Sequence, residues 1–271
     1  MKEVTTYDRV LKARDKKRPQ VTDYIKELFE DFIELKGDRL SKDDESILGG
    51  IAMFHGTPVT IIGQRKGKTI EENIRFNFGM VSPEGYRKGM RLMKQAEKFN
   101  RPVITFIDTP GAYPGKEAEE HGQANAIAES MAMMSSLKVP IIVIVTGEGN
   151  SGGALALGVG DKIWMLENSI YAVLSPEGFA SILWKDSSLA SKASEVMKIT
   201  AQELYEFGLI DDVIAEDKNM YKVIDKKLQK ELKRLEKLSP AVLVENRYQK
   251  FRNIDEKKKP IKEHPSTRAI S

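Results

Sequence analysis

The sequence predicts an α/β fold, in which buried strands alternate with helices. Two uninterrupted apolar runs, Pro102–Ile107 and Pro140–Val145, carry this prediction, since each leads through a glycine-containing loop into a helical segment. Continuous runs of this kind are typical of strands covered on both faces, and the strand–loop–helix repeat requires crossover connections. With 271 residues, 41% of them hydrophobic, the chain can bury such a sheet in one large domain.

Before this repeat, the sequence predicts an arm, a helix and a pair of strands. Residues 1–20 are highly charged and form the predicted N-terminal arm. A helix is expected over Val21–Leu35, because apolar residues recur at helical spacing after Thr22 and Asp23. The next elements are strands over 47–52 and 57–64 around the turn-like pair His55-Gly56, a polar surface loop over 64–79 and an amphipathic helix over 83–100.

Helices dominate the second half of the chain outside the repeat. We expect a helix over about 118–137, short strands over 161–165 and 169–173, helices from Pro176 onwards and a charged amphipathic helix pair over 219–251. One domain is therefore predicted over residues 21–252. The charged tail over 253–271 is predicted to be disordered.

The composition excludes several kinds of site. The chain has no cysteine, so disulfides, thiol nucleophiles and cysteine-ligated zinc are excluded, and its three histidines are too far apart in sequence to suggest a metal site. The 43 basic and 40 acidic residues leave a net charge of +3, which argues against nucleic-acid binding by bulk charge. No signal peptide or membrane-spanning run is recognisable, so we expect a cytoplasmic protein without membrane contact.

The most informative stretch is the loop Gly147–Gly153 (GEGNSGG), which follows the second apolar run. It lies where a buried strand leads into a helix, and free backbone N–H groups and the helix dipole favour negative charge there. Gly152 and Gly153 leave these N–H groups unobstructed. Gly111 and Ala112 occupy a similar place after the first run. We prefer an oxyanion hole made of backbone amides, because such a site needs no titratable side chain.

The same loop also partly matches the sequence patterns of other kinds of site. A phosphate-binding P-loop is excluded, because the glycines are not followed by Lys-Ser or Lys-Thr, and the match of 147–152 to the dinucleotide pattern G-x-G-x-x-G is weak in mid-chain. Residues 149–153 also fit the nucleophile elbow G-x-S-x-G, with Ser151 as nucleophile, but the only downstream histidine is His264. A serine hydrolase and a non-catalytic scaffold with glycines for close helix packing remain alternatives.

Five motifs resemble the α-subunit family of bacterial acetyl-coenzyme A carboxylase carboxyltransferases. The likeness runs from about residue 18 to 252 and rests on Asn77–Met80, Pro83–Lys88, Phe106–Gly115, Gly147–Gly160 and Ser175–Gly178. It implies a crotonase-like β-β-α superhelix with helical N- and C-terminal extensions. It also implies transfer of a carboxyl group from carboxybiotin to acetyl-coenzyme A, giving malonyl-coenzyme A for fatty-acid synthesis.

The resemblance further implies a set of partners. Biotin would be carried covalently on a separate carrier protein, and ATP would be used by a separate biotin carboxylase component. A β subunit with a zinc ribbon would hold acetyl-coenzyme A, most simply in an α2β2 heterotetramer. This chain would then hold no metal of its own and would be active only in the complex.

Carried over residue by residue, the resemblance assigns the biotin side of the site to this chain. The N–H groups of Gly152 and Gly153, with neighbouring Ala154, would stabilise negative charge on the ureido oxygen of biotin. Gly111 and Ala112 would line the same side. Three basic residues are candidates for contact with coenzyme phosphates or the carrier, unless they belong to a solvated surface loop: Arg65, Lys66 and Lys68.

The chain departs from the family pattern in two places. Many relatives have glycine where this chain has Asn150, although asparagine tolerates left-handed backbone angles better than most residues. Relatives also often have a longer helical N-terminal extension, so assembly contacts made by that extension are in doubt. Asp108 is expected to brace its turn, and Glu177 to favour the start of its helix.

Overall fold

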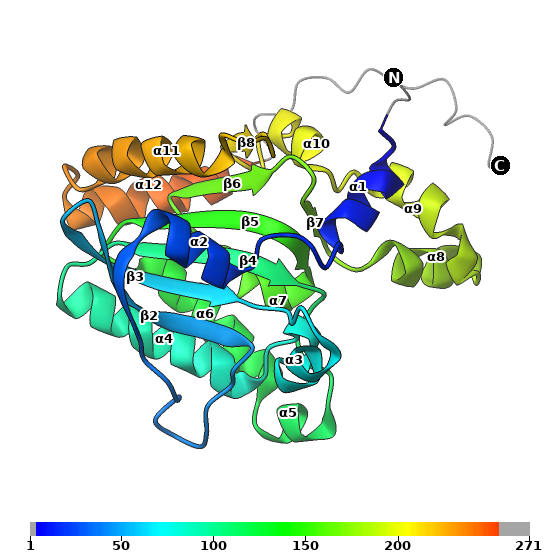
Figure 1. Cartoon of the computed structure of the whole chain (residues 1–271), viewed down its shortest axis with the longest axis horizontal. Helices are drawn as coiled ribbons and strands as arrows, with labels where there is room; N and C mark the ends of the chain where they lie inside the picture. The colour runs from blue at the N-terminus through cyan, green and yellow to red at the C-terminus, as the bar shows by residue number, and fades with distance from the viewer. Residues whose placement is uncertain (1–3, 255–271) are drawn as a thin grey trace.

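Eight strands form one hydrogen-bonded sheet at the centre of residues 4–254, the part of the chain that the computed structural model describes (Figure 1). The sheet order is β1-β2-β3-β4-β5-β6-β8, and β7 pairs with β5 beside this row. The first three strands are antiparallel and all later pairs are parallel. Their bounds are β1 Glu30–Glu34, β2 Ile47–Phe54, β3 Thr57–Gln64, β4 Val103–Thr109, β5 Ile141–Asn150, β6 Lys162–Leu166, β7 Ile170–Ala172 and β8 Asp212–Ile214.

Helices cover both faces of the sheet, which confirms the predicted α/β class (Figure 1). Val143 and Val145 of β5 pack in the cluster that includes residues of α4 and α6, while Ile142 and Ile144 pack in the cluster that includes residues of α2 and α11. This alternation explains why the strands read as continuous apolar runs. The α-helices are α1 Thr6–Ala13, α2 Val21–Leu28, α3 Ile70–Arg75, α4 Pro83–Lys98, α5 Lys116–Glu120, α6 Gln123–Ser136, α7 Ser151–Leu155, α8 Pro176–Trp184, α9 Ala190–Met197, α10 Ala201–Glu206, α11 Met220–Leu235 and α12 Pro240–Arg252.

Strand β5 divides the sheet at its carboxyl end. Its residues 142–145 pair with β6, whereas its residues 148–150 pair with β7. The fork lies within the stretch 147–153 that the sequence predicts to be a loop: its residues 147–150 end β5, and 151–153 begin α7 without a loop between them. Since β4 and β5 are parallel neighbours, the segments that follow them leave the same edge of the sheet.

Three local predictions differ from the structure. The single helix expected over 21–35 is wrong: α2 ends at Leu28, Phe29 is extended, and β1 pairs with the edge of β2. This pairing is non-local, so the helical spacing could not reveal it. The loop expected over 64–79 contains α3 and the short 3₁₀ helix Asn77–Gly79, and the helix expected over 118–137 is split into α5 and α6 by Gly122.

The predicted N-terminal arm contains a packed helix. Val10 and Ala13 of α1 are buried against Ile170 and Ile199. Most of the tail predicted over 253–271 lies outside the described residues. Within residues 4–254, no helix is both long and apolar enough to cross a bilayer.

Candidate functional site

The loop after β4 touches the start of α7, which directly follows β5, through glycine. A Cβ atom added to Gly153 would lie 2.6 Å from the carbonyl carbon of Gly111 and 2.7 Å from the amide nitrogen of Ala112. Real Cβ atoms essentially never come this close to backbone, so the contact requires glycine at 153. Gly111 itself has a φ of +145°, which side chains rarely permit. The structure therefore brings Gly111, Ala112 and Gly153 together.

The start of α7 presents backbone N–H groups at this contact. Asn150 precedes the helix in an extended conformation, and its side chain does not cap it. The first N–H groups of any helix have no partner within the helix, which leaves those of Gly152 and Gly153 directed toward the start of α7. Ser151 has a φ of +57° and turns the chain sharply from strand to helix.

An apolar cavity opens beside these amides. It has a volume of about 600 Å³, and Ser151, Gly152 and Leu155 of α7 line one side of it. The remaining lining is mainly aromatic and aliphatic: Tyr171, Ala172, Val173, Leu174, Phe179, Met197, Lys198, Ile199, Leu204, Phe207, Leu209 and Phe251. In such surroundings a hydrogen bond from an amide to a charged oxygen is stronger than in water.

A network of charged side chains lies behind the glycine loop. The ammonium of Lys66 lies 2.7 Å from Asp108 Oδ1 and 2.8 Å from Glu148 Oε2. Arg14 links Glu148 to Glu177, with distances of 2.8 Å to each carboxylate. The backbone amide of Glu148 also donates to Asp108 Oδ1 at 3.0 Å. The network thus joins the ends of β4 and β5 to α1 and α8.

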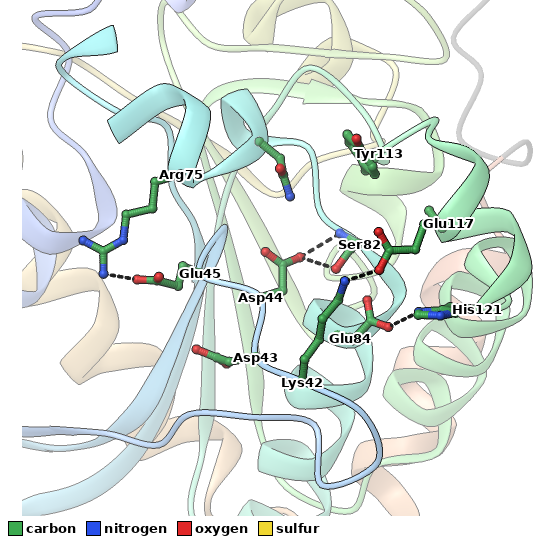
Figure 2. Close-up of a pocket in the computed structure, with 12 residues that line it drawn as sticks. Lys42, Asp43, Asp44, Glu45, Arg75, Ser82, Glu84, Tyr113, Glu117 and His121 are labelled. Carbon is green, nitrogen blue, oxygen red and sulfur yellow. Dashed lines mark hydrogen bonds and ion pairs between the residues drawn. The ribbon is translucent and has the colours of Figure 1, made fainter. Parts of the chain in front are cut away.

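A second pocket, smaller and polar, lies beside the loop after β4 (Figure 2). Its volume is about 240 Å³, and Tyr113 of that loop lines it. Figure 2 shows four pairs of its polar and charged side chains that point toward each other. The pairs are Ser82 with Asp44, Lys42 with Glu117, Arg75 with Glu45 and His121 with Glu84. Three of these pairs connect the segment between β1 and β2 to α3, α5 and the start of α4, and the fourth connects the end of α5 to α4.

No histidine base for Ser151 is found within residues 4–254. Neither His55 nor His121 lines the cavity that Ser151 lines. The Nδ1 atom of His121 instead lies 2.7 Å from Glu84 Oε1 in the polar pocket (Figure 2). His264, the histidine that the hydrolase interpretation requires, lies outside the described residues.

Comparison with known proteins identifies the family. The sequence model described as acetyl co-enzyme A carboxylase carboxyltransferase-like matches residues 1–255. The chain belongs to this family.

Relatives within this carboxyltransferase-like family match nearly the whole chain. A Halalkalibacterium halodurans protein named acetyl-coenzyme A carboxylase carboxyl transferase subunit alpha is 57% identical over 258 residues, which cover 92% of this chain and 79% of that protein. The Bacillus subtilis protein of the same name is 56% identical, with coverage of 93% and 80%. A Natranaerobius thermophilus protein named subunits beta/alpha is also 56% identical over 93% of this chain, which spans 43% of that longer protein.

Solved structures confirm the predicted crotonase-like fold. The transcarboxylase 12S structure with methylmalonyl-coenzyme A bound has a TM-score of 0.67 at 20% identity, over 85% of this chain and 45% of that one. The β subunit of Pseudomonas aeruginosa geranyl-CoA carboxylase has a TM-score of 0.67 at 16% identity, over 89% and 45%. This chain therefore spans less than half the length of either.

The three basic residues expected to meet coenzyme phosphates or the carrier are all paired with acidic groups. The ammonium of Lys66 already bonds two carboxylates, with which a phosphate or a carrier group would have to compete, and its role in binding stays a prediction. Arg65 donates to the Glu45 carbonyl and stacks on the Phe76 ring at 4.2 Å. Lys68 is half-exposed and bonds Asp23 at 2.9 Å. Lys68 thus fits the solvated surface loop that the sequence left as an alternative, whereas the side chain of Arg65 is 13% exposed and largely covered.

Sequence reasoning missed two residues that contact the glycine loop or the network behind it. Arg14 lies 134 positions before its partner Glu148, and Gln64 lies 89 positions before Gly153, to which it donates a hydrogen bond. For Gln64 the available signal was a polar residue at the last position of an apolar strand. No local signal distinguished Arg14 from the other basic residues of the N-terminal segment.

We expect the network of Lys66, Glu148 and Arg14 to make the stability of this protein depend on pH in the acid range. Burial raises the pKa of Glu148, but the ion pairs with Lys66 and Arg14 outweigh it and hold the pKa below its ordinary value of 4.5. A carboxyl group with a lowered pKa contributes stability that is complete above the unfolded value and is lost as the pH falls through the folded value. The stabilisation from Glu148 is therefore complete at neutral pH, begins to be lost as the pH falls below about 4.5, and is gone only below the lowered pKa of the folded state.

This dependence can be measured with Glu148→Gln. The variant should be less stable than the wild type at pH 7, because Lys66 and Arg14 lose a charged partner. The difference in the free energy of unfolding should narrow as the pH falls from about 4.5 through the lowered pKa of folded Glu148, because wild-type Glu148 is then protonated as well. Urea unfolding at a series of pH values measures the difference. A gap that stays constant down to the acid transition would contradict the assignment.

Proposed function

We propose that this chain is the α subunit of an acetyl-coenzyme A carboxylase carboxyltransferase. With a β subunit, it would transfer a carboxyl group from carboxybiotin on a separate carrier protein to acetyl-coenzyme A, giving malonyl-coenzyme A for fatty-acid synthesis. The observation that carries this proposal is the 57% identity, over 92% of the chain, to a relative of that name. ATP would be used by the separate biotin carboxylase component.

The biotin side of the site is proposed to be the start of α7. The close contact between Gly153 and Gly111 leaves no room for a Cβ atom at position 153. Next to it, the N–H groups at the start of α7, which no side chain caps, face an apolar cavity. This arrangement fits a neutral, planar ring with one carbonyl oxygen. Carboxybiotin supplies the carboxyl group, and negative charge develops on its ureido oxygen as that group leaves.

The residues of this chain would act on that charge by hydrogen bonding alone. The N–H groups of Gly152 and Gly153 are proposed as the oxyanion donors, with Ala154 beside them. Gly111 and Ala112 would hold Gly153 from the loop after β4. Since these donors are fixed before the reaction, no reorganisation is needed when the charge appears.

The partner is proposed to be a β subunit that covers the apolar cavity. Three large apolar side chains on or beside α8 are exposed although they adjoin the cavity region, namely Val173 at 79%, Ile182 at 63% and Leu183 at 57%. Exposed apolar groups of this kind mark protein interfaces. The Natranaerobius relative is named for both subunits, which supports pairing. An α2β2 assembly, a zinc ribbon on β and a cytoplasmic location remain predictions.

A serine hydrolase is the second candidate, favoured by one observation. Ser151 combines a G-x-S-x-G setting with a φ of +57°, and a nucleophile elbow has the same sharp strand-to-helix turn. If the chain were a non-catalytic scaffold, substitutions at Ser151 and at Gly153 that preserve the fold would leave its function unchanged.

Malonyl-coenzyme A turnover in the reverse direction, with biocytin as acceptor, tests the proposal. We expect activity from the chain with its β subunit and none from the chain alone. Ser151→Ala should retain activity within about threefold, whereas loss of a hydrolase nucleophile costs on the order of 10⁶-fold in kcat. Folded, associated subunits that show no transfer would sink the transferase proposal, and loss of a hydrolytic activity in Ser151→Ala would favour its rival.

A further inference from the structure

The buried side chain of Gln64 connects the end of β3 to the end of β4 and to α7. Gln64 is the last residue of β3, and its side chain is 1% exposed. Its Nε2 atom donates to the carbonyl oxygen of Gly153 at 2.7 Å. Its Oε1 atom accepts from the backbone amide of Asp108, at the end of β4, at 3.2 Å. One orientation of the amide group satisfies both bonds, so the side chain spans from β3 across β4 to α7.

The Gly153 carbonyl needs this donor because α7 is a single turn. In a longer helix the amide of Leu157 would donate to Gly153, but here it donates to the carbonyl of Ala154 at 3.1 Å. Gly153 is buried, so water does not readily replace the missing partner. The Nε2 group of Gln64 supplies it.

We propose that Gln64 is a positioning residue for carboxyl transfer, which it serves by fixing the peptide between Gly153 and Ala154. This inference rests on the function proposed above. In a trans peptide the N–H points opposite to the carbonyl, so a carbonyl held by Gln64 also fixes the N–H of Ala154, which is placed to make the first hydrogen bond within α7, to the Asn150 carbonyl. The Gly111 backbone holds Gly153 on another side. Together these contacts hold the first turn of α7, which presents the proposed oxyanion donors.

The charges around Gln64 explain why a neutral amide suits this position. Asp108, on β4, and Glu148, on β5, share the ammonium of Lys66 just beyond the end of β3. A carboxylate at position 64 would add a third negative group and would place an acceptor against the Gly153 carbonyl. Only its protonated form could donate to Gly153 and accept from Asp108, as glutamine does.

Two substitutions test the inference in the complete α–β complex. Gln64→Met keeps the volume but removes both hydrogen bonds, and we expect kcat for the reverse reaction to fall by about 10- to 100-fold with KM for malonyl-coenzyme A unchanged. Hydrogen–deuterium exchange over residues 147–157 should become faster in the same variant. In Gln64→Glu, activity relative to the wild type should recover as the pH is lowered and the carboxyl group becomes protonated.

Thr60→Val is the matched control, because it removes a buried polar contact from the same strand away from the loop. Thr60 is fully buried and its Oγ1 atom accepts from Arg101 Nε at 3.2 Å. The control should lose stability while kcat and exchange over 147–157 stay at wild-type values. A loss of kcat in Thr60→Val equal to that in Gln64→Met would overturn the inference, as would wild-type kcat in Gln64→Met.

The two readouts separate this inference from the proposed function. A wild-type complex that is folded but transfers no carboxyl group would overturn the proposed function. In that case faster exchange over 147–157 in Gln64→Met would still support the clamp on α7, and unchanged exchange would overturn it. Faster exchange with full activity would show that the clamp exists but does not serve the reaction, which overturns the positioning role.

Discussion

Gly153→Val is expected to abolish carboxyl transfer, with a fall in kcat of at least about 10²- to 10³-fold, the cost of one lost oxyanion donor. A Cβ atom at this position would lie 2.6 Å from the Gly111 carbonyl carbon and 2.7 Å from the Ala112 nitrogen. Both are backbone atoms, so they cannot give way by a change of rotamer. The two loops must therefore separate, and the amides of α7 move with them. Reverse turnover of malonyl-coenzyme A by the α–β complex measures the loss.

A buried glycine elsewhere provides the control for this prediction. A Cβ atom on Gly89, within α4, would lie 3.6 Å from the nearest side-chain atom, which is an ordinary contact. Gly89→Ala should therefore retain the fold, association with β and wild-type kcat. Thermal unfolding of each variant would show that Gly153→Val acts on the site rather than on the whole fold. A folded Gly153→Val complex with wild-type turnover would rule out this role of the amides.

Arg247→Met is expected to lower the free energy of unfolding by about 3–5 kcal/mol, the usual cost of breaking a buried ion pair from one side. The guanidinium is 1% exposed and lies within 2.9 Å of both carboxylate oxygens of Asp161. It also donates to the carbonyls of Met134, Leu137 and Val139, at 2.7, 2.7 and 3.1 Å. Its removal leaves a buried carboxylate and three carbonyls without these donors.

Urea unfolding of the isolated chain measures this loss, and the same helix offers a control. Arg252 is exposed at the end of α12, so Arg252→Met should change the free energy of unfolding by less than about 0.5 kcal/mol. The double variant Arg247→Met with Asp161→Asn should recover part of the loss, because the buried charge is then removed from both sides. A loss below about 1 kcal/mol for Arg247→Met would show that α12 is held mainly by its apolar contacts.

The parallel strands could be predicted because their burial on both faces determines which residue types they contain. Strands β4 and β5 are covered on both faces, so residues 103–107 and 141–145 are apolar except for Thr105, and each run is easily recognised in the sequence. The segment 21–35 failed for the opposite reason. Its apolar spacing suits a helix, but β1 forms by pairing with β2, a contact with residues that lie 16 or more positions later. Local periodicity carries no information about such a partner.

For the site, the sequence by itself determined the two glycine loops and the place of each at the end of a buried strand. Both features can be recognised from consecutive residues, because glycine frees the backbone at its own position and a run of apolar residues indicates a buried strand. Only the tertiary structure decided that Gly153 rests against Gly111, that Lys66 is enclosed by Asp108 and Glu148, and that Gln64 reaches α7. Those contacts join residues that lie 40 to 90 positions apart in the sequence. They are close in space because β3, β4 and β5 are neighbours in the sheet.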